Sequence, residues 1–263
     1  MSTILDEIVA NRLEEVSNLR KASCLLEIKE KTDFATPRNS LAKTLLNPQS
    51  SGIIAEFKRR SPSKGVINNG VQPETVTRGY AEAGASGLSV LTDERYFGGN
   101  ITDFMAARSA NPFIPLLRKD FMVHEFQLFE SRMLNADVIL LIAAILEKSE
   151  ISRFTSIAHE LGMEVLLELH DESEIDKIDQ EVDMIGINNR NLKDFKVDLD
   201  RSLKLLDRLP ARAVKISESG LSDPETVDYL RNRGFQGFLM GENFMKSENP
   251  GSACRDFISK LKV

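Results

Sequence analysis

The chain is poor in cysteine, histidine and aromatic residues. Its 263 residues include two Cys, three His, three Tyr and no Trp. Cys24 and Cys254 are too few for the disulfide framework of a small secreted protein, so we expect a reduced, cytoplasmic setting. The histidines, His124, His159 and His170, form no compact motif with the cysteines. The spacings typical of zinc sites are absent, and the sequence therefore predicts no bound metal.

Long apolar runs and an excess of basic charge are also missing. The longest strongly apolar stretch, Val138–Leu146, is far shorter than the ~20 residues that a membrane-spanning helix needs. Asp6 and Glu7 stand near the amino terminus, where a targeting peptide would be apolar or basic. The net charge of -6 argues against a nucleic-acid-binding face. We therefore expect neither membrane nor nucleic acid as a partner.

An amphipathic helix is predicted at the start of the chain. Apolar residues recur there at three- and four-residue steps: Leu5, Ile8, Val9, Leu13, Val16 and Leu19. A polar stretch with Pro37 and Asn39 follows before the first convincing strand. We interpret residues 1–50 as a helical extension whose helix covers the underside of the domain, and residues 51–263 as the domain itself.

Short β-branched or apolar runs then alternate with amphipathic helical stretches. Eight strands are predicted: Gly52–Phe57, Gly87–Thr92, Phe113–Leu117, Asp137–Ile142, Glu164–Leu169, Met184–Asn188, Ala213–Ser217 and Gly237–Met240. Strands that alternate with helices form parallel βαβ units. No Gly-x-Gly-x-x-Gly follows the first strand, so the signature of a dinucleotide-binding sheet is lacking. The pattern and length indicate an α/β fold, a single (β/α)₈ TIM barrel with an extra N-terminal helical segment.

Charged residues recur where the predicted strands end. Glu56 and Lys58 are two apart and share one side of a strand, while Phe57 points to the other side. Lys119 and Glu168 end two further strands. Each alone is commonly a solvated rim residue or half of a structural ion pair. Because a barrel gathers its strand ends, we expect these four charges to share a cleft suited to acid–base chemistry.

The last two strands are followed by glycines. Ser219 and Gly220 come after the seventh strand, and Gly241 and Glu242 come after the eighth. Each pair alone is also compatible with an ordinary tight turn. Such barrels commonly bind phosphate at this position, where glycines let backbone N–H groups approach an anion. The residues predict a phosphate-binding barrel enzyme and do not by themselves choose the substrate.

Several long segments resemble the indole-3-glycerol-phosphate synthase family. They are Ile4–Ala10, Ile54–Gly65 (IAEFKRRSPSKG), Leu88–Phe97 (LSVLTDERYF), Leu117–Phe121 (LRKDF) and Ile187–Leu192 (INNRNL). They stand in the family's order, and the similarity extends over nearly the whole chain. The resemblance implies a lyase of tryptophan biosynthesis that acts on 1-(2-carboxyphenylamino)-1-deoxyribulose 5-phosphate. It would close an indole ring with loss of CO₂ and water, without a cofactor and as a monomer.

The resemblance also implies roles for the charged residues. Lys119 would be the general acid that protonates the substrate carbonyl, and Lys58 would contact the substrate carboxylate and serve in dehydration. Glu56 and Glu168 would supply the base and electrostatic roles, and the division between them is left open. Glu218 would support one of the lysines.

Further positions match residues that orient or contact substrate. Asn188 and Ser219 would orient it. Polar contacts to substrate or phosphate are implied for Ser61, Arg190, Gly220, Gly241 and Glu242. An apolar wall for the aromatic ring is implied for Phe97, Phe121, Leu192 and Leu239. Glu242 stands where some members have a serine, which matters little if its backbone N–H makes the contact.

Two rival interpretations remain. A phosphate-binding isomerase of the tryptophan or histidine pathway would have the same fold. The isomerase of the preceding step commonly has a cysteine at a first-strand end, and none stands there. A barrel that only binds a phosphorylated ligand would not need all four charged candidates. A scaffold role has still less support, because nothing resembles an interaction tail.

Overall fold

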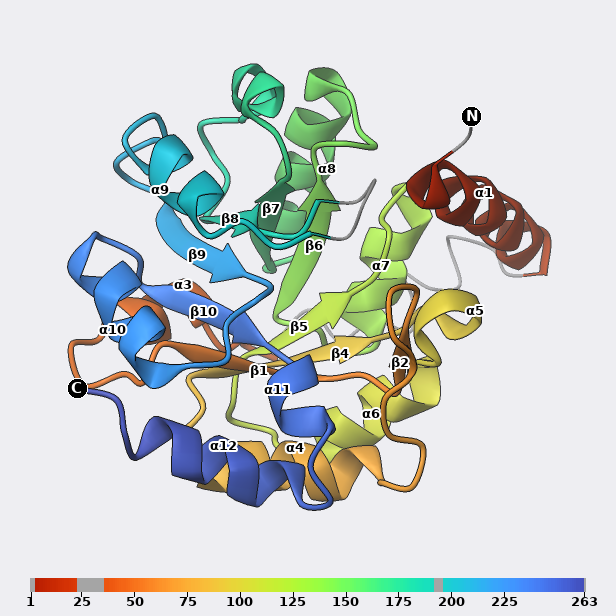
Figure 1. The fold of residues 1–263 in the computed structure, drawn as a ribbon. Coiled ribbons are helices and arrows are strands. Elements are labelled where there is room, and N and C mark those ends of the chain that lie inside the picture. Colours follow the sequence, from red (N-terminus) through yellow and green to blue (C-terminus); the bar gives the residue numbers. More distant parts are fainter. Residues whose placement is uncertain (1–2, 23–35, 192–195, 263) are drawn as a thin grey trace.

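A computed structural model describes residues 3–22, 36–191 and 196–262. Eight parallel strands close into a barrel, and each strand pairs with its neighbours along the chain (Figure 1). The strands are β1 (Ile53–Phe57), β4 (Gly87–Leu91), β5 (Leu116–Lys119), β6 (Val138–Ile142), β7 (Glu164–Leu169), β8 (Met184–Asn188), β9 (Val214–Glu218) and β10 (Gly237–Met240). Pairing of β1 with both β4 and β10 closes the ring. The predicted (β/α)₈ barrel is confirmed.

Helices surround the barrel. They are α4 (Pro73–Glu82), α6 (Ile101–Ala110), α7 (Phe126–Met133), α8 (Lys148–Glu160), the 3₁₀ helix η1 (Glu172–Lys177), α9 (Asp200–Leu206), α10 (Pro224–Asn232) and α12 (Pro250–Ile258). Short helices α5 (Glu94–Phe97) and α11 (Glu242–Met245) and a small hairpin of β2 (Arg60–Ser61) and β3 (Gly65–Val66) decorate the loops. Among the described residues, no helix is long and apolar enough to cross a membrane.

The alternation of side chains along each strand divides the apolar core in two. Ile53, Ala55 and Phe57 of β1 face the surrounding helices, whereas Ile54 faces the barrel interior. The interior is filled by residues such as Leu117, Val138, Leu140, Leu166, Met184, Ile216 and Leu239. The barrel interior is thus a packed core and not a pore. It ends at the amino ends of the strands on one side and at their carboxyl ends on the other.

The third strand begins later than predicted. Residues 113–115 precede β5, which starts at Leu116, and the side chain of Phe113 is 85% exposed. Pro115 lacks a backbone N–H and contributes only its carbonyl, which accepts from Leu88 N–H at 2.9 Å. The correction places Lys119, and not Leu117, at the end of the strand.

Helix α3 (Leu41–Leu46) closes the amino end of the barrel. Leu41 and Leu45 join the interior cluster, and a Cβ on Gly87 would lie 2.5 Å from Leu41 Cδ1. Glu164 at the start of β7 accepts from the N–H groups of Leu41 and Ala42 at 2.8 and 3.0 Å. This short helix, which the sequence pattern did not reveal, is therefore the cover of the underside.

Helix α1 (Ile4–Ala22) lies elsewhere than predicted. Ile4, Leu5 and Ile8 line the cavity at the carboxyl end of the strands, and Val16 packs against Phe126 of α7. Figure 1 shows α1 beside α7 and α5. The expected position on the underside is wrong, because α3 already covers that surface and the apolar stripe of α1 packs at the opposite end.

Candidate active site

Strand alternation brings the predicted charged residues into the barrel mouth. On β5, Leu117 faces the interior and Lys119, two residues later, does the same one layer higher. Arg118 between them points outward and contacts Glu130 of α7 at 2.7 Å. On β5 this alternation brings Lys119 to the cavity and keeps Arg118 away from it, which explains why Lys119 is a candidate and the equally charged Arg118 is structural.

Lys119 lies at the centre of a carboxylate cluster. Its Nζ is 2.5 Å from Glu168 Oε2 on β7 and 2.9 Å from Glu218 Oε2 on β9. Asn188 of β8 donates from Nδ2 to the other oxygen of Glu168 at 2.8 Å. All four side chains are buried or half-buried, so these contacts form where water screens them weakly.

The charges of this cluster depend on one another. Burial alone would lower the pKa of Lys119, but the carboxylates of Glu168, Glu218 and Glu56 raise it, so the ammonium stays protonated. Burial alone would raise the pKa of Glu168, and the charges of Lys119 and His170 lower it well below its ordinary value. Burial raises the pKa of Glu218 to about 7 despite Lys119. One carboxyl group here thus changes its charge near neutral pH.

A second ion pair lies on β1. Lys58 Nζ is 2.7 Å from Glu56 Oε1, and Ser89 Oγ on β4 donates to Glu56 Oε2 at 3.4 Å. The predicted placement of Glu56 and Lys58 on one side of the strand is confirmed, and Phe57 is buried on the other side.

Two glycines leave room for these carboxylates. A Cβ on Gly186 of β8 would lie 2.0 Å from Glu218 Oε1, and a Cβ on Gly241 would lie 2.7 Å from Glu56 Oε1. Any side chain at Gly186 would push Glu218 away from Lys119. The cluster therefore requires these small residues as much as it requires the charges.

The charged residues line a cavity of about 440 Å³, a size typical of small-molecule sites. With one exception, all predicted site residues line it: Glu56, Lys58, Ser61, Phe97, Lys119, Phe121, Glu168, Asn188, Arg190, Glu218, Ser219, Gly220, Leu239, Gly241 and Glu242. The exception, Leu192, lies outside the described residues. The structure brings the candidates together, and their individual roles stay predictions.

One side of the cavity is apolar. Phe97 and Phe121 are tilted toward each other with ring centroids 5.9 Å apart, and Leu239 lies in the interior layer below. Further apolar lining residues that sequence reasoning did not single out are Ile4, Leu5, Ile8, Leu140 and Ile142. A flat aromatic group fits this wall better than a charged one.

The opposite side is built from polar loops. Ser219 and Gly220 both have positive φ, 69° and 75°, which turns the chain sharply after β9. A Cβ on Gly220 would lie 2.2 Å from Val197, so glycine is required there. Arg190 Nη2 lies 3.4 Å from the carboxylate of Glu242. The cation and the tight turn border the same part of the cavity.

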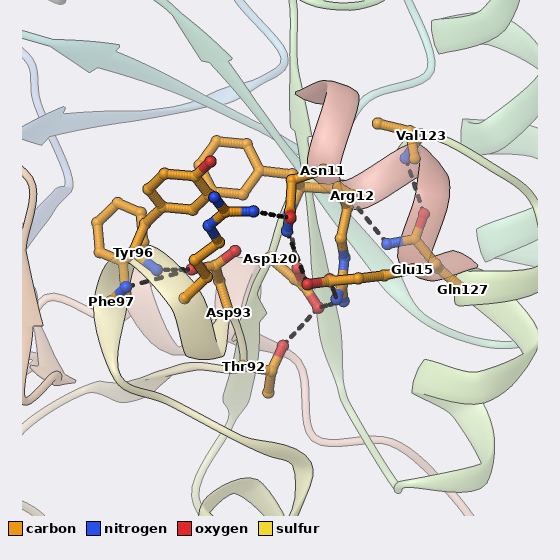
Figure 2. A network of polar contacts seen from close by, with 12 residues as sticks. Asn11, Arg12, Glu15, Thr92, Asp93, Tyr96, Phe97, Asp120, Val123 and Gln127 are labelled. Carbon is orange, nitrogen blue, oxygen red and sulfur yellow. Dashed lines mark hydrogen bonds and ion pairs between the residues drawn. The ribbon is translucent and has the colours of Figure 1, made fainter. Parts of the chain in front are cut away.

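Polar contacts hold α1 over the mouth. Figure 2 shows the ion pair between Arg12 of α1 and Asp120. Asp120 directly follows Lys119 in the sequence. Asp120 also accepts from Thr92 Oγ1 at 2.6 Å and from Arg118 Nη2 at 3.0 Å. Because Arg12 and Asp120 are both buried, this pair ties the position of α1 to the strand that carries Lys119.

His170 is a site residue that sequence reasoning missed. It lines the cavity, and its Nε2 lies 2.9 Å from Glu168 Oε1. The signal was available, since His170 follows Glu168 by two residues and shares its side of the strand. Within the described ranges, no group of three His, Cys, Asp or Glu side chains is placed to hold a metal ion.

Solved structures share the fold. The alpha subunit of tryptophan synthase from Legionella pneumophila matches with a TM-score of 0.60 at 12% identity, over 85% of this chain and 99% of that one. A tryptophan synthase structure from Pyrococcus furiosus matches with a TM-score of 0.57 at 14% identity, over 81% and 98% of the two chains. At this identity the likeness supports the barrel fold alone.

Sequence relatives are much closer. The family model described as indole-3-glycerol phosphate synthase matches residues 5–257. A protein of that name from Bacteroides thetaiotaomicron is 46% identical over 264 residues, covering all of both chains. Another from Laribacter hongkongensis is 45% identical over 258 residues, covering 96% of this chain and 98% of its own. The chain therefore belongs to the indole-3-glycerol-phosphate synthase family.

Proposed function

We propose that the chain converts 1-(2-carboxyphenylamino)-1-deoxyribulose 5-phosphate to indole-3-glycerol phosphate, CO₂ and water. The observation that carries the proposal is Lys119, which is held between Glu168 and Glu218 and faces a cavity with one apolar and one polar side. The substrate has a matching division, with an aromatic ring at one end and a phosphate at the other.

The cavity orients the substrate in one direction. The ring packs against Phe97 and Phe121, and the phosphate lies by the turn at Ser219 and Gly220, where backbone N–H groups and Arg190 favour an anion. Barrels of this kind commonly bind phosphate after the seventh and eighth strands. The substrate carbonyl is then left near Lys119.

Ring closure needs an acid at the carbonyl oxygen. The ring carbon that bears the carboxylate attacks the carbonyl carbon, with electrons supplied by the arylamine nitrogen, and a C–C bond forms. Lys119 donates its proton to the developing alkoxide and becomes neutral. The carboxylates of Glu168 and Glu218 raise the pKa of Lys119, and they therefore favour its reprotonation after the step.

Loss of CO₂ and water completes the indole. The C–CO₂ bond breaks, its electron pair restores the aromatic ring, and Lys58 neutralises the carboxylate until it leaves. Lys58 then gives a proton to the new hydroxyl, which departs as water while a base removes a proton from the carbon next to nitrogen. Glu56 and Glu168 are the two candidate bases, since each is a buried carboxylate paired with a lysine.

A direct assay tests this activity. The purified chain is mixed with the substrate without added metal or cofactor, and indole fluorescence is followed. Because the chain contains no Trp, its own background is low. We expect a rise in indole signal with release of one CO₂ per indole. A folded chain that binds the substrate without forming indole would instead favour a barrel that only binds a phosphorylated ligand.

We also propose that a single copy of the chain is active, because one copy brings Lys58 and Lys119 into contact with their carboxylate partners without a residue from a second copy. Light scattering during gel filtration, at the protein concentration of the assay, is expected to give a monomer. An active dimer that loses activity on dilution to monomers would contradict this.

A further inference from the structure

His170 is a buried histidine on the inner side of the barrel, directly after β7. Leu169 before it faces the surrounding helices, so Glu168 and His170 share the side that faces the cavity. The side chain of His170 is 8% exposed. A histidine this buried beside a charged cluster needs a physical reason, because burial of a polar ring is costly unless it is well partnered.

Contacts around Glu168 supply that reason. His170 Nε2 lies 2.9 Å from Glu168 Oε1, and Asn188 Nδ2 donates to the same oxygen at 2.8 Å. Lys119 Nζ occupies the other oxygen at 2.5 Å. The two oxygens of Glu168 are thus held by different partners, and the rotation of the carboxylate is fixed.

The charges that face His170 favour its cationic form. Glu168 of β7, Glu218 of β9 and Glu174 of η1 surround it, and Glu174 Oε2 accepts from the backbone N–H of His170 at 2.7 Å. Lys119 is the nearby cation, and it is itself paired with Glu168 and Glu218. Burial alone would lower the pKa of His170, and the three carboxylates raise it above its ordinary value.

We propose that His170 is a positioning residue for ring closure: it holds Oε1 of Glu168 so that Oε2 stays directed at Lys119. The proposal rests on the proposed function, which it deepens. Without His170, Glu168 keeps Asn188 and Lys119 but loses a cation and one restraint on its rotation. Its pKa then rises, and Lys119 is less well aimed at the carbonyl oxygen.

Two variants separate positioning from packing. His170→Leu fills similar space without a polar atom, whereas His170→Gln places an amide N–H near the position of Nε2. We expect His170→Leu to lower kcat about tenfold to a hundredfold, the effect of one lost charge-assisted contact, with little change in KM. His170→Gln is expected to recover most of kcat. The acid limb of the kcat–pH profile should move to higher pH in His170→Leu.

A matched control is available at the other end of the barrel. His159 Nε2 also lies 2.9 Å from a carboxylate, that of Asp183, so His159→Leu removes a similar pair outside the cavity. It is expected to leave kcat and the pH profile unchanged. The inference is overturned if His170→Leu turns over like wild type, or if His170→Gln is equally slow with the acid limb unmoved. Wild type that forms no indole would instead contradict the proposed function itself.

Discussion

The two ends of the barrel hold glutamates with different hydrogen-bond partners. At the amino end, Glu164 accepts from Ser40 Oγ and from two backbone N–H groups of α3, so both of its carboxylate oxygens have hydrogen-bond donors. At the carboxyl end, Glu218 bonds Lys119 through Oε2, while its buried Oε1 has no hydrogen-bond partner among the described residues. Burial raises the pKa of both.

The difference separates stability from chemistry. At the amino end, apolar side chains and helix-capping hydrogen bonds close the barrel. At the carboxyl end, like charges share a small volume, which costs folding free energy and keeps groups ready to exchange protons. Substitutions at the two ends should therefore change different measured quantities.

The largest effect on stability is expected from Leu41→Ala at the amino end. Leu41 is fully buried in the interior cluster, so its loss leaves a cavity and should lower the free energy of unfolding by about 2–5 kcal/mol. Turnover of the folded protein should be unchanged. Denaturant unfolding checks this, with Leu46→Ala, 59% exposed on the same helix, as the control. A loss of kcat in folded Leu41→Ala would contradict the claim that the amino end contributes to stability and not to turnover.

Arg12→Gln tests whether the ion pair with Asp120 holds α1 at the carboxyl end of the strands. In this variant Asp120 still bonds Arg118 and Thr92, so it loses only one charge-assisted hydrogen bond. The free energy that holds α1 on the barrel should fall by roughly 1.5–3 kcal/mol. Amide hydrogen exchange in α1 should become faster, and KM should rise because Ile8 of α1 lines the cavity.

The control for this change is Arg20→Gln, an exposed substitution in the last turn of the same helix. It should alter neither KM nor exchange. Unchanged exchange in Arg12→Gln would show that the ion pair with Asp120 does not hold α1.

A third test uses the binding of the phosphate. Indole-3-glycerol phosphate should compete with substrate, and its dephosphorylated analogue should bind about tenfold to a hundredfold more weakly, the loss of one charge-assisted contact. Arg190→Met removes the guanidinium at that side of the cavity. It should therefore reduce the difference in affinity between the phosphorylated and the dephosphorylated ligand. Equal affinity of wild type for both ligands would contradict a phosphate site by Ser219 and Gly220.

The smallest effect concerns pH. The pKa of Glu218 is about 7 in the folded chain and near 4.5 when unfolded, so the folded state binds the extra proton between these values. Stability from this group is present below pH 4.5 and is lost as pH rises toward 7, by up to about 1 kcal/mol per pH unit. In Glu218→Gln the contribution of this group is lost, so the fall of the unfolding free energy measured at pH 5, 6 and 7 should become shallower. An unchanged slope would assign the titration to another group.

Much of the carboxyl end could be predicted from the sequence, because it depends on strand alternation. Once β1 and β5 were recognised, the period of two placed Lys58 and Lys119 on the inner side, and parallel closure brought them together. The loops for which we propose phosphate binding were predicted from their position after the last strands. His170 was overlooked because a lone histidine after an apolar strand carries no motif.

The helices of the N-terminal segment could not be placed in this way. An amphipathic stripe indicates that α1 covers an apolar surface and does not say which one. Its position depends on pairs such as Arg12 with Asp120, which lie 108 residues apart. Helix α3 has only six residues, too few for its periodicity to stand out. The division into extension and single barrel domain stays a prediction.

The most direct test of the carboxyl end as the site of chemistry is the turnover of Lys119→Ala. Its control is Lys43→Ala, the same change on the exposed side of α3 at the amino end. Indole formation is measured at saturating substrate, with circular dichroism to show that each variant is folded. We predict that Lys119→Ala loses about 10²–10⁴ in kcat, the contribution of a general acid, while Lys43→Ala matches wild type. A folded Lys119→Ala with near-normal kcat would contradict the assignment of Lys119 as the acid.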